Sequence, residues 1–71
     1  MERQQVQSEM IRAIGYDKAT QVLEIEFHRQ NRVYRYFAVP PFLYEGMMIS
    51  RSKGKFFTDK IAERYRAEQV F

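Results

Sequence analysis

Residues 22–41, VLEIEFHRQNRVYRYFAVPP, contain the pattern on which the rest of the fold depends. In residues 22–28, apolar side chains alternate with Glu and His, which is the period of a strand with one buried face. Residues 32–39 have the β-branched and aromatic composition of a second strand. Asn31, in the short polar connection, tolerates a left-handed backbone conformation. The pattern therefore predicts an antiparallel hairpin that ends at a double proline.

The length of the hairpin connection decides where the two tyrosines of the second strand point. With a three-residue tip, Tyr34 lies opposite Glu26 and Tyr36 lies opposite Glu24. Cross-strand partners share a face of the sheet, so we expect both tyrosines on the open face. This register also places Arg35 among apolar side chains, where its stem can lie along them. A slip of one residue, or a bulge, turns both tyrosines into the core instead, and the sequence leaves that alternative open.

The segments around the hairpin predict one more strand and two helices. Alternation from Ser8 to Lys18 indicates a first strand. Pro40 favours an extended residue before it, and Pro41 suits the first turn of a helix that runs to Ser50.

A second helix follows, with apolar residues four apart at Phe57, Ile61 and Tyr65. Ser52 or Thr58 is its N-cap, and we favour Ser52. The expected fold is α+β: a three-stranded antiparallel meander followed by two helices packed on one face, in the order β-β-β-α-α. Residues 1–7 are expected to form a flexible lead, and residues 8–71 a single domain.

Composition narrows the class of protein. The 71 residues include no cysteine and one histidine, His28, so disulfides and thiolate or multi-histidine metal sites are not expected. No apolar run approaches the roughly 20 residues that span a bilayer. The polar start of the chain lacks the apolar core of a secretory signal. We expect a cytoplasmic protein with no membrane segment, metal or cofactor.

Catalysis is not expected from these residues. Glu24 and Glu26 lie on one face of the predicted strand. General acid–base chemistry requires an enclosed site that separates the pKa values of the two carboxyls, and an open sheet face offers none. Both side chains are expected to be solvated. The SKGK run at residues 52–55 lacks the spacing of a phosphate-binding P-loop.

Positive charge gathers in the middle of the chain. The net charge is +3, and between Phe27 and Thr58 six Lys and Arg residues face a single acidic residue. Exposed aromatics interleaved with arginines form a platform for single-stranded bases. The strand residues predicted for this platform are Arg32, Tyr34, Arg35 and Tyr36, with Tyr16 on the neighbouring strand as a secondary candidate.

A second candidate element is the start of the second helix. If Ser52 caps it, the free backbone N–H groups of Lys53, Gly54 and Lys55 are available to an anion such as phosphate. The alternative is a solvated basic loop. A rival function is also open: the aromatic face or an unpaired strand edge would suit a partner protein or a second copy of this chain.

The chain from about Ser8 to Tyr65 resembles the KTSC domain, which is named after a C-terminal extension of some lysyl-tRNA synthetases. The resemblance rests on SEMIRAIGYD and LEIEF, the YxY of residues 34–36, VPP at residues 39–41, and SKGKFFTDKI at residues 52–61. It implies a small stand-alone bacterial or phage protein, with RNA or tRNA binding as the suggested activity. The tip HRQNR looks one residue longer than the family's tight glycine turn.

Overall fold

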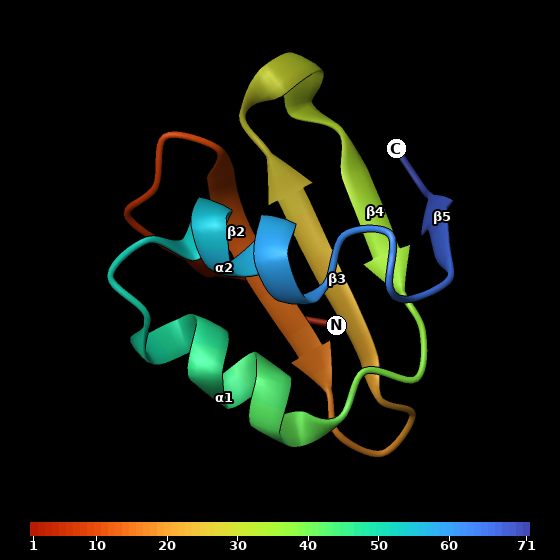
Figure 1. Cartoon of the computed structure of the whole chain (residues 1–71). Helices are drawn as coiled ribbons and strands as arrows, with labels where there is room; N and C mark the ends of the chain where they lie inside the picture. The colour runs from red at the N-terminus through yellow and green to blue at the C-terminus, as the bar shows by residue number, and fades with distance from the viewer.

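A computed structural model describes all residues from 1 to 71 as an α+β fold, with two helices on one side of a five-stranded antiparallel sheet (Figure 1). The strands lie in chain order across the sheet: β1 (Gln4–Gln5), β2 (Ile11–Asp17), β3 (Val22–Phe27), β4 (Val33–Tyr36) and β5 (Ala67–Gln69). A 3₁₀ turn, η1 (Arg29–Asn31), forms the hairpin tip, and the helices are α1 (Pro41–Ile49) and α2 (Lys53–Lys60).

The α+β class and the helix pair are confirmed, but a three-stranded meander understates the sheet. β1 pairs with β2 at one edge, and β5 pairs with β4 at the other. Gln4 and Gln5, within the predicted lead, form β1. At the other end of the chain, the Val33 N–H donates to the carbonyl oxygen of Phe71. β1 has only two residues and β5 only three, too few to show hydrophobic alternation, so the sequence pattern does not reveal them.

Both helix starts follow the sequence signals. Pro40 is extended and α1 begins at Pro41. Ser52 caps α2, because its Oγ accepts a hydrogen bond from the Lys55 N–H at 3.2 Å. The choice of Ser52 over Thr58 is therefore confirmed. The helix ends at Lys60, before the predicted contact at Tyr65.

The predicted register of the hairpin is wrong by one residue. Tyr36 pairs with Leu23 and Tyr34 with Ile25, whereas Arg35 pairs with Glu24. The reason lies in the tip, where Gln30 and Asn31 both adopt positive φ angles, 58° and 53°. Two left-handed residues in succession accommodate one more connecting residue than the predicted three. Because side chains alternate along a strand, that single residue exchanges the two faces of β4.

The core lies between the sheet and the helices. It consists of Ile11, Ile14, Leu23, Ile25, Tyr36, Val39, Met47, Phe57 and Ile61. Tyr36 is only 7% exposed and packs edge-to-face on Phe57 of α2, with ring centres 5.3 Å apart. The predicted exposure of the tyrosine face is therefore corrected: it is the helix-covered face, with Tyr36 buried and Tyr34 half-buried. Both rings supply aromatic packing that a domain of this size needs.

Candidate functional site

Four aromatic rings join the hairpin to α2. Tyr36 and Phe57 form the buried part, and Phe27 packs edge-to-face on Phe57 at 5.4 Å. Tyr34 completes the group, 5.9 Å from Phe27 and 6.4 Å from Tyr36. Phe27 and Tyr34 are only half-buried, so this group continues from the core to the surface at the hairpin tip.

The half-buried end of this aromatic group borders a hollow of about 320 Å³, which we call the tip hollow. Its lining residues are Glu9, Met10, Phe27, Arg29, Arg32 and Tyr34. It therefore combines apolar and aromatic walls with two arginines from the η1 turn and its flank.

A second and larger hollow, of about 640 Å³, lies at the N-terminus of α2, and we call it the helix hollow. Arg51, Ser52, Lys53, Gly54 and Lys55 line it on the helix side. The opposite wall comes from the segment before β2, including the same Glu9 and Met10 that line the tip hollow. The two hollows are thus neighbours on one surface. Gly54 makes the approach close, since a Cβ there would lie 3.3 Å from the Cβ of Met10.

The lysines of the helix hollow already have protein partners. Lys53 Nζ donates to the carbonyl oxygen of Ser50 at 2.9 Å. Lys55 Nζ forms an ion pair with Asp59 at 2.8 Å, one helical turn later. This hydrogen bond raises the pKa of Lys55 and lowers that of Asp59. Lys55 therefore remains charged at neutral pH, and its pairing with Asp59 is solvent-exposed, so a phosphate can compete for it.

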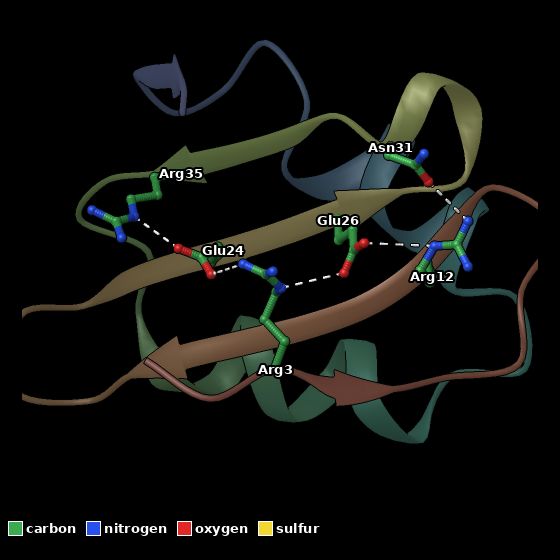
Figure 2. Close-up of polar contacts among 6 residues, drawn as sticks. All are labelled: Arg3, Arg12, Glu24, Glu26, Asn31 and Arg35. Atoms are coloured by element: carbon green, nitrogen blue, oxygen red, sulfur yellow. Dashed lines mark hydrogen bonds and ion pairs between the residues drawn. The ribbon is translucent and has the colours of Figure 1, made fainter. Parts of the chain in front are cut away.

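The open face of the sheet carries a ladder of alternating charges in place of the predicted tyrosines (Figure 2). From β4 toward the hairpin tip its members are Arg35, Glu24, Arg3, Glu26 and Arg12, and Arg12 also donates a hydrogen bond to the amide oxygen of Asn31. Glu24 pairs with Arg3 and, at 2.8 Å, with Arg35. Arg3 comes from the segment before β1, so the ladder joins the start of the chain to the middle of the sheet.

The expectation that Glu24 is solvated is wrong, since the residue is 2% exposed. Burial raises the pKa of its carboxyl, but hydrogen bonds from Arg35 and Arg3 outweigh burial and hold the pKa below its usual value. Glu24 is therefore ionised and neutralised by two guanidinium groups. Such a carboxylate acts as a structural anchor, because each of its two oxygens accepts a hydrogen bond from a guanidinium group.

The structure divides the predicted site residues into two groups. Arg32, Tyr34, Ser52, Lys53, Gly54 and Lys55 line the two neighbouring hollows. The other three do not reach them: Tyr36 is in the core, and Arg35 lies on the opposite face of the sheet. Tyr16 stacks on Tyr44 at 4.7 Å and donates its hydroxyl hydrogen to the carbonyl oxygen of Val39.

Nine further lining residues lie outside the set that the sequence predicts: Gln7, Ser8, Glu9, Met10, Phe27, Arg29, Arg51, Thr58 and Asp59. They come from the segment before β2, the end of β3, the η1 turn, the connection between the helices and the later part of α2. Arg29 and Arg51 belong to the basic middle of the chain, which is the one available signal. No cluster of three or more metal-ligating side chains occurs in the chain, and neither helix has the length and apolar character needed to cross a membrane.

Comparisons with a family model and with a solved structure point to the same family. The family model of the KTSC domain matches residues 7–65. A protein of Tsukamurella paurometabola is 36% identical over 64 residues, which cover 90% of this chain and 94% of that protein. The crystal structure of a KTSC domain protein from Yersinia pestis superposes with a TM-score of 0.94 at 36% identity, covering 99% of this chain and 97% of the other.

A longer relative also contains a matching segment. The lysine–tRNA ligase of Nostoc punctiforme is 38% identical over 61 residues, which cover 86% of this chain but only 11% of the ligase.

Proposed function

This chain belongs to the KTSC domain family, and from that premise we propose that it is a non-enzymatic domain that binds RNA, tRNA or another single-stranded nucleic acid. The proposed interface consists of the tip hollow and the helix hollow together. Support by association comes from the ligase of Nostoc punctiforme, whose name assigns it a tRNA substrate and which contains a similar segment.

The observation that carries the proposal is the continuity of the two hollows. The tip hollow offers the half-buried rings of Phe27 and Tyr34, on which a base can stack. The helix hollow offers the cations that follow a phosphate backbone, together with the capped start of α2. Because they share the wall formed by Glu9 and Met10, one short strand can contact both at once.

The proposed interface differs from the strand platform that the sequence predicted. It retains Arg32 and Tyr34 from the hairpin and adds Arg29 beside them. It omits Tyr36, because a base could stack on that ring only if the core unpacked. It also omits Arg35, whose Nε donates a hydrogen bond to Glu24. The proposal thus places base stacking at the hairpin tip and away from the open face.

The experiment is a titration of the ¹⁵N-labelled domain with a short single-stranded RNA and with a tRNA pool, at two salt concentrations. We expect salt-sensitive shifts at the two hollows and none at the charge ladder. For single strands, the slope of log K against log salt is about −0.7 for each phosphate contact. Arg32→Ala should therefore reduce that slope by about 0.7. Lys18→Ala, in the exposed turn after β2, is the matched control and should leave it unchanged.

The proposal is refuted if no amide peak moves at low salt with either RNA. It is also refuted if the shifts gather on the open face around Glu24, because that surface is shared with neither hollow.

A protein partner is the second candidate, favoured by the outer surface of α1. Phe42 and Ile49, seven residues apart and therefore on one side of the helix, are 69% and 86% exposed. Apolar side chains exposed in this way favour a protein contact. Sedimentation of the wild-type protein and of Ile49→Ser over a range of concentrations separates self-association from a monomer.

A further inference from the structure

Glu9 is one of two acidic residues that line the hollows; the other, Asp59, is paired with Lys55. It lines both the tip hollow and the helix hollow, which also contain Arg29, Arg32, Arg51, Lys53 and Lys55. None of these five cations pairs with it; the ion pairs of the chain involve only Glu24, Glu26 and Asp59 as acids. A carboxylate here opposes phosphate binding, yet it is free to accept hydrogen bonds from another group.

The backbone on both sides of Glu9 is held in place while its side chain is exposed. Ser8 Oγ accepts hydrogen bonds from the N–H groups of Met10 and Ile11, at 3.2 and 3.1 Å. The His28 N–H donates to the carbonyl oxygen of Met10 at 3.1 Å, which ties this turn to the end of β3. The Glu9 carboxylate is therefore presented from a defined position beside the aromatic wall of the tip hollow.

The tip hollow has the size and lining of a site for one planar group. Its volume of about 320 Å³ lies within the range of roughly 300–1,000 Å³ for small-ligand sites. Phe27 and Tyr34, which both line it, pack edge-to-face on each other at an interplanar angle of 80°. Arg29 and Arg32 provide charge for the phosphate that accompanies a nucleobase.

We infer that the tip hollow is a guanine site in which the Glu9 carboxylate reads the Watson–Crick edge of the base. This rests on the proposed function. Guanine presents two donors side by side, N1–H and the N2 amine, and the two carboxylate oxygens accept both. Adenine and cytosine present one amine beside a ring nitrogen acceptor, and uracil presents one N–H between two carbonyl oxygens. Those acceptors face the carboxylate unfavourably.

The test compares four hexaribonucleotides: U₆ and its three variants with G, A or C at the third position. Binding is measured by fluorescence anisotropy at one fixed, low salt concentration. A good bidentate contact discriminates by about 1–3 kcal/mol. We therefore expect the G oligomer to bind wild-type protein at least about tenfold more tightly than the others, since tenfold corresponds to about 1.4 kcal/mol.

Glu9→Gln separates base reading from simple charge. An amide offers one acceptor and one donor, so the G oligomer should lose its preference of about tenfold. Removing a negative charge should leave the binding of the other three unchanged or strengthen it. Glu45→Gln, the same change at an exposed position of α1 outside both hollows, is the control and should retain the preference.

The outcomes distinguish the two proposals. Equal affinities of wild-type protein for all four oligomers, or a uniform gain in Glu9→Gln, overturn the guanine site and leave nucleic-acid binding intact. If no oligomer binds wild-type protein even at low salt, the proposed function itself fails.

Discussion

Replacing Glu24 by Gln tests whether the charge ladder on the open face stabilises the fold. The substitution keeps the size of the side chain and removes its charge, so Arg3 and Arg35 lose their common partner. Breaking a fully buried ion pair costs about 3–5 kcal/mol. Here the arginine side chains are 34% and 46% exposed. Water therefore screens part of the loss, and we expect a cost of about 2–3 kcal/mol.

That cost is large for a chain of this length. The free energy of unfolding of a 71-residue domain is about 4–10 kcal/mol. Thermal and urea unfolding, followed by circular dichroism at pH 7, should show a Tm lowered by roughly 10–20 °C. Glu26→Gln is the matched control. Its side chain is 21% exposed and its ion pairs are longer, at 3.3 and 3.6 Å. Its loss should stay below about 1 kcal/mol.

The pH dependence gives a second and independent measurement of the same contact. The pKa of Glu24 is lowered in the folded protein, so its stabilisation is present above the unfolded value of about 4.3 and disappears as pH falls through the folded value. The gap between wild type and Glu24→Gln should thus narrow in strong acid. Equal losses in Glu24→Gln and Glu26→Gln at pH 7, or a gap that is constant with pH, would refute this account.

Three further predictions concern single positions. In Gly15→Ala, the new Cβ would lie 2.7 Å from the carbonyl oxygen of Glu2. We expect the free energy of unfolding to fall by about 1–3 kcal/mol, with amide shifts confined to the start of the chain and β2. An unchanged amide spectrum would contradict this. Burial, and secondarily the neighbouring Tyr34, raise the pKa of Tyr36 to about 12. The free energy of unfolding should therefore fall as pH rises from about 10, the unfolded value, to about 12. Tyr36→Phe should remove that fall when unfolding is measured over this alkaline range. Ser52→Ala removes the cap of α2 and should cost about 1 kcal/mol in thermal unfolding, whereas Ser52→Asp should retain the helix; equal melting of both variants would exclude capping.

Much of the fold could be predicted because its signals are local. The alternation in β2 and β3 depends on neighbouring residues, and so does the start of α1 at Pro41. The cap of α2 at Ser52 depends only on a side chain three residues from its backbone partner. These features gave the α+β class, the helix pair and the basic segment at α2 correctly. Half of the candidate site, at the helix hollow, followed from them.

The arrangement of the tip hollow and the burial of Glu24 required the tertiary structure, because they depend on contacts between distant parts of the chain. The faces of Tyr34 and Tyr36 follow from whether the hairpin connection is odd or even, and two left-handed residues, Gln30 and Asn31, settle it. The burial of Glu24 needs an arginine 21 residues earlier in the chain, which no local pattern reveals. Local chemistry selects strands, turns and caps, because their energies depend on adjacent residues. Only packing across the sheet selects which face is covered, because a shift of one residue exchanges every side chain between core and solvent.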